Sequence, residues 1–335
     1  MVFLRNHWYV AAWSDEVQEE PLGRKILGED IALYRTASGK AAAINSVCPH
    51  RFAPLEYGVV IGENLKCRYH GLQFGPDGGC AVIPAGVRSP KMRTKAYPVA
   101  ERDGTIWVWI GDDDQIADSP DIMDLDGKFG GTIRGHLQID AHYQLVVDNL
   151  MDDAHATHLH AVFETEGHLL APTPTVRAEG DQVFADTFIA DTSLIPAFGP
   201  FYDKPGNVDQ WLSFQWDAPS FVTLTAGVQP TGQPRDEGIS TKSVQMITPA
   251  TETSSHYFWS LSRDCKLDDD ALSEKMHGIL SHVFRTEDKW MLEGQQRMMG
   301  DKSFWENKPI LLPQDKAANA VRRRVDTLMA AQEGS

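Results

Sequence analysis

Two short pairs of cysteine and histidine constrain this chain more than any other feature of its sequence. One pair has the spacing Cys-x-His, the other has Cys-x-x-His, and 16 residues separate them: Cys48 with His50, and Cys67 with His70. Thiolate and imidazole ligands in two short loops serve either a zinc ion or an iron–sulfur cluster. A structural zinc site usually repeats pairs of one type, whereas each pair here mixes both. The mixture favours a [2Fe–2S] cluster in which one iron takes two thiolates and the other takes two imidazoles.

The residues around both pairs resemble the cluster motifs of the Rieske oxygenases. The two segments read CPHR at 48–51 and CRYHGLQF at 67–74. The resemblance implies that the two thiolates hold one iron of a Rieske cluster and that the two imidazoles hold the other. Arg68 stands where many relatives have Pro or Gly, but that position is not a ligand position, so the assignment is unaffected.

Charge and cysteine content exclude several classes of protein. The formal net charge is −16, and the one basic run, at 322–324, is short; both argue against nucleic acid or an anionic membrane as a partner. The chain has four cysteines, of which two belong to the pairs, so a disulfide framework is not expected and a reducing compartment is. No signal peptide pattern and no apolar run of about 18 residues is present. We therefore expect a cytoplasmic protein that does not cross a membrane.

The spacing of strand and helix signals predicts two domains and an α+β fold. Short strands separated by turns predict an all-β domain first, with the cluster loops at hairpin tips. An acidic, turn-rich segment at 112–127 marks the boundary, so the predicted domains are 1–115 and 116–335. The second domain is expected to contain an antiparallel sheet with strands at 182–189, 210–216, 221–227, 242–247 and 256–261, and helices at 146–162, 268–299 and 317–329.

A second metal site is predicted within residues 147–160. This segment holds three carboxylates and three imidazoles in 14 positions. A solvated, charged helix surface is the simpler interpretation, but histidines rarely cluster without a metal or catalytic role. Two histidines and one carboxylate form the ligand set of non-haem iron(II) oxygenases, which leaves positions open for dioxygen. The segment therefore predicts a mononuclear iron site.

Helical periodicity and the family resemblance favour different histidine pairs. His155 and His158 share a face of a regular helix, whereas His155 and His160 lie about 140° apart at roughly 100° per residue. The pattern DNLMDxxHxxxxH at 148–160 resembles the iron motif of the vanillate and dicamba demethylase branch, in which the helix is irregular. That resemblance implies His155 and His160 as ligands, and we follow it, treating His158 as a neighbour of the site.

The third ligand is expected from the predicted helix at 268–299. Asp288 falls on an apolar stripe of that helix, formed by Met276, Leu280, Phe284 and Met291. A buried carboxylate needs a cation or a donor, and a buried Arg partner is the alternative to a metal. The family also carries its ligand Asp on a late helix, in a motif that matches residues 287–289. Both arguments predict Asp288 as the ligand.

Two further residues of the first iron motif are expected to act beside the metal. Asp152 lies three residues before His155, where its carboxylate is expected to hydrogen-bond a metal-bound imidazole. In the family the matching Asp bridges a cluster His of a neighbouring subunit to an iron-ligand His. The resemblance therefore implies a head-to-tail homotrimer with an electron path through His70, Asp152 and His155. Asn149 matches a residue near the iron in some relatives.

The resemblance also implies the fold and the reaction. The expected fold is a Rieske domain followed by a helix-grip (START-like) catalytic domain. The expected activity is that of the oxygenase component of a monooxygenase, which hydroxylates or O-demethylates a small methoxylated aromatic acid with O2. Electrons would come from NAD(P)H through a separate flavin or ferredoxin reductase, because no Gly-x-Gly-x-x-Gly opens a strand-to-helix unit here. Alternatives are methyl hydroxylation, N-demethylation or ring dihydroxylation, and, in a different class, a non-catalytic Rieske electron carrier, for which the second domain has no task.

One polar residue is a candidate for contact with the substrate. Gln245 lies in a predicted strand between Val244 and Met246. Its amide would supply hydrogen bonds but no charge. A solvent-facing position on the strand is the alternative.

Overall fold

The computed structural model describes residues 3–84, 86, 91–121, 127–163 and 173–334, which form two compact units. One unit comprises the chain up to residue 121 together with 248–252, and the other comprises the rest. The predicted boundary between 115 and 116 stays a prediction, and residues 122–126 of the acidic segment lie outside the described residues. None of the described helices is long and apolar enough to span a bilayer.

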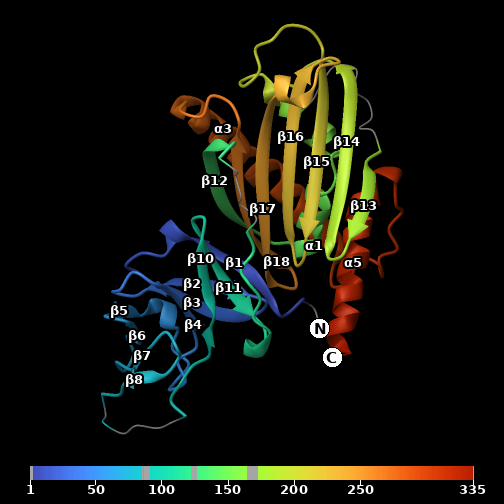
Figure 1. Cartoon of the computed structure of the whole chain (residues 1–335). Coiled ribbons are helices and arrows are strands. Elements are labelled where there is room, and N and C mark those ends of the chain that lie inside the picture. Colours follow the sequence, from blue (N-terminus) through green and yellow to red (C-terminus); the bar gives the residue numbers. More distant parts are fainter. Residues whose placement is uncertain (1–2, 85, 87–90, 122–126, 164–172, 335) are drawn as a thin grey trace. The chain divides into compact units, whose positions relative to one another are not determined.

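The N-terminal unit consists of three small antiparallel sheets (Figure 1). Their strand orders are β1-β11-β10, β2-β3-β4-β9 and β5-β6-β7-β8. The strands are β1 (His7–Trp13), β2 (Leu22–Ile26), β3 (Glu29–Arg35), β4 (Ala41–Asn45), β5 (Val59–Ile61), β6 (Asn64–Lys66), β7 (Gln73–Phe74), β8 (Cys80–Val82), β9 (Ala96–Tyr97), β10 (Val99–Arg102) and β11 (Thr105–Ile110). The β10–β11 hairpin closes at Asp103 and Gly104, both with positive φ, as two-residue hairpin turns require.

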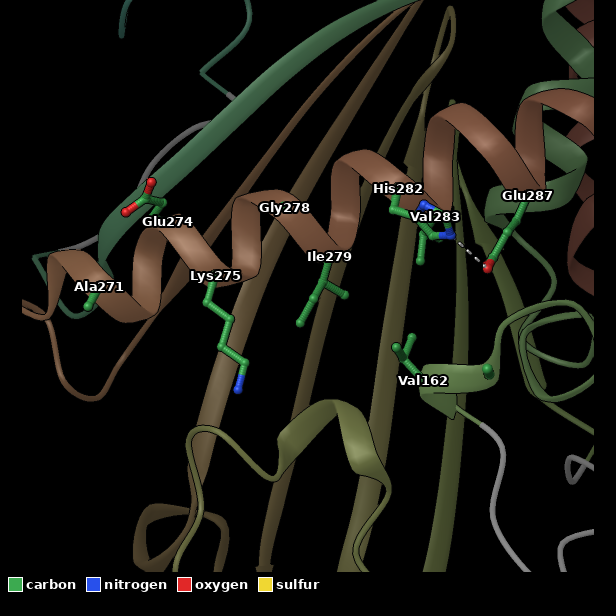
Figure 2. Close-up of a pocket in the computed structure, with 10 residues that line it drawn as sticks. Val162, Ala271, Glu274, Lys275, Gly278, Ile279, His282, Val283 and Glu287 are labelled. Carbon is green, nitrogen blue, oxygen red and sulfur yellow. Dashed lines mark ion pairs between the residues drawn. The ribbon is translucent and has the colours of Figure 1, made fainter.

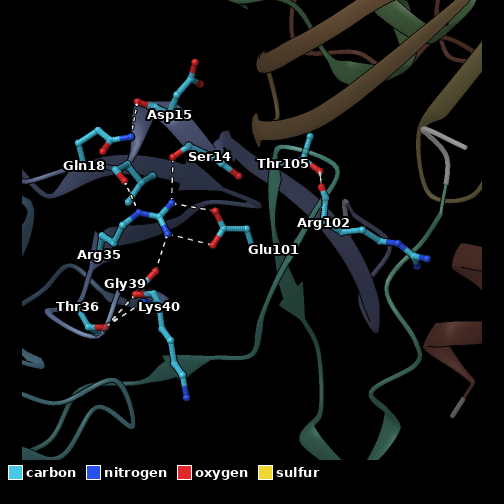
Figure 3. Close-up of polar contacts among 11 residues, drawn as sticks. Ser14, Asp15, Gln18, Arg35, Thr36, Gly39, Lys40, Glu101, Arg102 and Thr105 are labelled. Atoms are coloured by element: carbon cyan, nitrogen blue, oxygen red, sulfur yellow. Dashed lines mark hydrogen bonds and ion pairs between the residues drawn. The ribbon is translucent and has the colours of Figure 1, made fainter. Parts of the chain in front are cut away.

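Arg35, at the end of β3, joins two loops and strand β10 of this unit (Figure 3). Its guanidinium donates to the carbonyls of Ser14 (3.0 Å), Val17 (2.9 Å) and Gly39 (2.9 Å). It also pairs with both carboxylate oxygens of Glu101 on β10, and this hydrogen bonding lowers the pKa of Glu101. One planar fork thus satisfies backbone acceptors that the short strands leave unpaired.

The C-terminal unit is built on one seven-stranded sheet. The order is β12-β18-β17-β16-β15-β14-β13, and the strands are β12 (Gly130–Ile139), β13 (Thr175–Glu179), β14 (Gln182–Thr192), β15 (Val208–Asp217), β16 (Phe221–Pro230), β17 (Ile239–Thr251) and β18 (Ser254–Arg263). All five predicted strands are present. The sequence pattern missed β12 and β13, which are the two edge strands of the sheet. An edge strand has a neighbour on one side only, so its residues do not alternate strictly between apolar and polar.

The helices of this unit are less regular than predicted. They are α1 (Tyr143–Leu150), α2 (Ala156–Leu159), α3 (Asp270–His282), α4 (Lys289–Met299) and α5 (Lys316–Glu333), and a π-helical segment (Val283–Asp288) joins α3 to α4. The helix predicted at 146–162 begins earlier and breaks after Leu150. The π-helical segment inserts one residue per turn, so Leu292 is buried in place of Met291.

A buried ion pair links α1 to α5. Arg322 on α5 is 4% exposed, and its Nε lies 2.8 Å and 3.0 Å from the two carboxylate oxygens of Asp148. Its Nη1 donates to Gln144 Oε1 at 3.1 Å. The neighbouring Val321 and Val325 are buried, so the terminal helix packs through apolar contacts and anchors α1 through charge.

We predict that Arg35→Lys lowers the free energy of unfolding by about 1–2 kcal/mol, because an ammonium cannot replace the planar fork. Urea titration followed by hydrogen–deuterium exchange of peptides within residues 3–121 measures the change in the N-terminal unit. Lys25→Gln, which removes the more exposed pair of Lys25 with Asp30, is the matched control and should change stability by no more than about 0.5 kcal/mol. Equal effects of both substitutions would contradict the role given to Arg35.

Candidate metal centres and cavity

The two cysteines of the first motif lie in one apolar core. Cys48 and Cys67 are each 1% exposed and pack in a cluster with residues of β3, β4 and β6. Burial raises the pKa of Cys48, and the neighbouring Cys67 thiol adds to the shift. Two adjacent buried thiols can both ionise only beside a positive charge. This donor set therefore fits a bound cluster, which would supply that charge.

The two cluster loops share one backbone geometry despite their unlike spacing. In the first, Cys48 N donates to Ala53 O (3.0 Å) and Phe52 N donates to Cys48 O (2.9 Å). In the second, Cys67 N donates to the carbonyl five residues on (2.8 Å), and Gly71 N donates to Cys67 O (3.0 Å). Phe52 and Gly71 both have positive φ, 59° and 76°. Each cysteine thus opens the same tight turn.

The two histidines of this motif face each other at the surface. The ring centroids of His50 and His70 lie 4.5 Å apart at an interplanar angle of 68°, and both residues are exposed. Tyr69, 61% exposed, packs against His70 with centroids 4.0 Å apart. The structure therefore brings the four predicted cluster residues together, with thiols inside and imidazoles outside.

The C-terminal unit brings His155, His160 and Asp288 together. One ligand atom of each lies within 4.8 Å of the others. Asp288 Oδ1 is 3.6 Å from His155 Nε2 and 3.3 Å from His160 Nε2. Asn149 Nδ2 donates to the same oxygen at 3.1 Å. Three of the predicted residues thus converge on one point, and Asn149 lies beside them.

Contacts on the far side of each ring set the direction of the two imidazoles. His155 Nδ1 lies 2.6 Å from the backbone carbonyl of Asp152, and His160 Nδ1 lies 2.6 Å from Glu287 Oε2. With a proton on each Nδ1, both Nε2 atoms are left as acceptors that face Asp288, which is how metal-bound histidines are usually held. Sequence reasoning did not assign this role to Glu287, although Glu287 belongs to the motif that identified Asp288.

The carboxylate of Asp152 does not make the hydrogen bond to His155 that the sequence predicted. Its carboxylate Oδ2 is 3.8 Å from His155 Nδ1, which is too long for a hydrogen bond. Its Oδ1 accepts from Ala154 N at 2.8 Å. The side chain therefore caps the turn that precedes α2, and its backbone carbonyl, not its carboxylate, orients His155.

The broken helix explains why periodicity favoured His155 with His158, whereas the structure brings His155 and His160 together. α1 ends at Leu150, His155 precedes the short α2, and His160 has an extended backbone. His158 points to solvent. On the regular helix assumed from the sequence, His160 would lie about 140° around the axis from His155. The break turns His160 toward Asp288.

Burial and the neighbouring polar side chains shift the pKa values of Asp288 and His160 in opposite directions. Burial alone would raise the pKa of Asp288, which is 3% exposed, but the neighbouring His155 and His160 rings outweigh burial and hold the pKa at about 2. Burial would lower the pKa of His160, but Asp288 and then Glu287 raise it. An ionised carboxylate beside two imidazole nitrogens is a site that a metal cation fits, because the cation can take the place of a proton between them.

A cavity of about 280 Å³ opens onto these residues. Its walls are the sheet face formed by β15, β16 and β17 and one side of α3, and apolar side chains dominate them. Gln245 is 4% exposed and lines the cavity, so the solvent-facing alternative is wrong. Figure 2 shows the adjoining groove along α3, where Val162, Ile279 and Val283 line both the groove and the cavity.

The chain matches two known domain families. The Rieske [2Fe-2S] domain matches residues 7–98, and the vanillate O-demethylase oxygenase C-terminal domain matches residues 139–331. The oxygenase component of chloroacetanilide N-alkylformylase from Rhizorhabdus wittichii is 39% identical, over 99% of this chain and 97% of that protein. The oxygenase component of dicamba O-demethylase from Stenotrophomonas maltophilia is 35% identical, over 98% of both.

A solved structure resembles the whole chain. The crystal structure of dicamba monooxygenase bound to 3,6-dichlorosalicylic acid superposes with a TM-score of 0.89 at 33% identity, covering 99% of each chain. The likeness confirms the predicted order of an all-β Rieske domain followed by an antiparallel-sheet catalytic domain.

We predict that His160→Ala loses mononuclear iron and keeps the cluster, because it removes one of the three side chains that converge at the expected iron site. His158→Ala, on the exposed side of the same segment, is the matched control and should keep both. Iron content per chain and the EPR signal of the reduced cluster measure the two centres separately. Iron lost from the His158 variant but kept in the His160 variant would mean that the helical pattern had been the better guide.

Proposed function

The chain belongs to the Rieske non-haem iron oxygenases whose catalytic domain is of the vanillate O-demethylase type, and on that premise we propose which residues hold its metals and which bond it oxidises. Membership makes it an oxygenase with one Rieske [2Fe–2S] cluster and one mononuclear iron, supplied with electrons by a separate reductase component. When bound, the cluster passes electrons and the iron activates dioxygen.

Cys48 and Cys67 hold one iron of the cluster in this proposal, and His50 and His70 hold the other. The adjacent buried thiols and the facing imidazoles support this assignment. The arrangement also sets a direction for electron flow. Because the imidazole side of the cluster is exposed, electrons would leave toward a partner through that side.

His155, His160 and Asp288 hold the mononuclear iron, with Asn149 beside them as a residue that orients the carboxylate through its hydrogen bond at 3.1 Å. His155 and His160 each keep a proton on Nδ1, donated to Asp152 O and Glu287 respectively. This arrangement leaves two Nε2 atoms and one carboxylate oxygen on one side, which is the facial arrangement that keeps other coordination positions open.

The single observation that carries the proposed reaction is that this triad lines an apolar cavity of about 280 Å³. Such a cavity accommodates a small aromatic substrate and excludes water from the reacting carbon. The relatives named above act on an anilide and on dicamba, so we propose oxidative dealkylation of a small aromatic ether or amide. For a methyl ether the balance is ArOCH3 + O2 + NAD(P)H + H⁺ → ArOH + CH2O + H2O + NAD(P)⁺, in which the hydroxylated methyl carbon leaves as formaldehyde.

We further propose that the protein acts in the cytoplasm as a head-to-tail homotrimer. The free cysteines suit a reducing compartment. In the trimer, His70 of one subunit would approach Asp152 and His155 of the next, so that the exposed imidazole completes an electron path between subunits. Methyl hydroxylation and ring dihydroxylation remain rival reactions on the same site.

Formaldehyde release tests the proposed reaction directly. The reconstituted system, with a Rieske-oxygenase reductase and NADH, should release one formaldehyde per O2 consumed from a methoxylated aromatic substrate. Iron content separates the proposal from an electron carrier, because an oxygenase binds about three irons per chain and a carrier binds two. Two irons per chain and no product from any substrate would leave only the carrier.

We predict that Asp152→Asn leaves both metals bound but slows oxidation of the reduced cluster by about tenfold or more. Asn keeps an oxygen that can accept from Ala154 N, so the turn should stay intact. It lacks the charge that would bind an approaching imidazole N–H strongly. A single-turnover measurement with substrate and O2 reports the rate, and size-exclusion chromatography checks the trimer. A wild-type rate in an intact trimer would remove Asp152 from the electron path.

A further inference from the structure

The polar side chains that the structure describes in the cavity wall carry no positive charge away from His155 and His160. Among the described lining residues there is no Lys or Arg, and the ionisable residues other than the two histidine ligands are all acidic: Asp152, Asp153 and Asp288. An aromatic carboxylate entering this cavity would find no cationic side chain among these described residues to pair with. The two positive charges of an iron(II) ion would already face three carboxylates nearby, so a fourth would be poorly compensated in an apolar cavity.

Polar groups of β17 and the neighbouring β18 hydrogen-bond one another in a series that we call the β17 chain. Tyr257 donates its hydroxyl to Gln245 Oε1 at 2.6 Å, and Gln245 Nε2 donates to Ser243 Oγ at 2.6 Å. Ser243 Oγ in turn donates to Ser260 O at 2.8 Å. The hydroxyl of Tyr257 stays a donor, because burial and then the charge of Asp288 raise its pKa well above the usual value. This chain of hydrogen bonds fixes the Gln245 amide and leaves its carbonyl oxygen occupied.

Gln210, on β15, differs from Gln245 in its hydrogen bonding. It is 6% exposed and lines the cavity, and its Oε1 has no hydrogen-bond partner among the described residues. A buried acceptor without a donor is costly and rare in folded proteins. The strand register places it away from the β17 chain: Gln210 pairs with Val228, and Val228 pairs with Ile239, six residues before Gln245. The β17 chain therefore does not supply its missing donor.

We propose that the substrate is an uncharged aromatic compound whose N–H or O–H group donates to Gln210 Oε1, and that the cavity discriminates against ionised aromatic acids. A carboxamide fits this requirement because it supplies N–H donors. A carboxylate has acceptors only, so it would leave Gln210 unpaired and add a charge that no described side chain of the cavity wall compensates. This inference rests on the proposed function, because it takes the cavity beside the iron triad as the substrate site.

Three matched ligands separate charge from donor capacity. 4-Methoxybenzamide is uncharged with a donor, 4-methoxy-N,N-dimethylbenzamide is uncharged without one, and 4-methoxybenzoate is charged. Isothermal titration of the anaerobic holoenzyme gives each dissociation constant, and formaldehyde release gives each kcat/KM. We expect the primary amide to bind at least about tenfold more tightly than either of the other two, because each leaves a buried group unpaired.

Gln210→Leu tests the residue, and Gln229→Leu is its matched control. Gln229 is 3% exposed and its Oε1 also has no partner among the described residues, but it does not line the cavity. Gln210→Leu should weaken binding of the primary amide by about tenfold and leave the dimethylamide unchanged, whereas Gln229→Leu should leave all three constants unchanged. Equal losses in both variants would mean that the effect is a general one on the fold, and would overturn the proposal.

A second control tests where the charge selection occurs. Lys275 lies on α3 in the adjoining groove, outside the cavity lining (Figure 2). Lys275→Gln should leave the ratio of amide to benzoate binding unchanged. If Lys275→Gln instead weakens benzoate binding and so raises the ratio of amide to benzoate binding, acids are held from the groove. That outcome would refute selection in the cavity.

The remaining outcomes separate this inference from the proposed function. Benzoate bound and demethylated as well as the primary amide would overturn the inference and leave the dealkylation intact; it would mean that Gln210 presents its Nε2 to the substrate. Selective binding of the primary amide with no formaldehyde from any ligand would support the inference and contradict the proposed dealkylation.

Discussion

The C-terminal unit depends on keeping one carboxylate ionised inside an apolar cavity. Asp288 is 3% exposed, and a buried charge of this kind is stable only with donors or a cation around it. The break after α1 and the π-helical segment meet this requirement together, because the first delivers His155 and His160 and the second delivers Asp288 and Glu287. Regular helices at both places would bury the carboxylate with fewer partners.

The sequence predicted the parts of this arrangement that depend on residue type. Cysteine and histidine are so restricted in their uses that two mixed pairs specify a cluster, and the central strands follow from alternating apolar residues. Asp288 was found because a carboxylate on an apolar stripe has few explanations. Recognition of the family motif, and not periodicity, selected His160 over His158, since the histidine spacing alone contained no sign of the break.

What the sequence could not provide were features that arise from non-local contacts. The edge strands β12 and β13 are set by their neighbours in the sheet, and the π-helical segment by the contacts that its side chains make. Asp152 illustrates the limit for side chains: its place beside His155 was predicted, but the structure assigns the hydrogen bond to its carbonyl and gives its carboxylate to Ala154 N. Gln210 had no sequence signal, because an unpaired acceptor is visible only when its surroundings are.

The ion pair between Arg322 and Asp148 has a practical consequence for work on this protein. Asp148 directly precedes Asn149, which donates to Asp288, so the last helix is connected through α1 to the site formed by His155, His160 and Asp288. The two residues of the pair are 174 positions apart in the chain. An affinity tag or fusion partner that displaces α5 would therefore disturb this site and change the activity. The C-terminus is a poor position for a tag that must leave the activity unchanged.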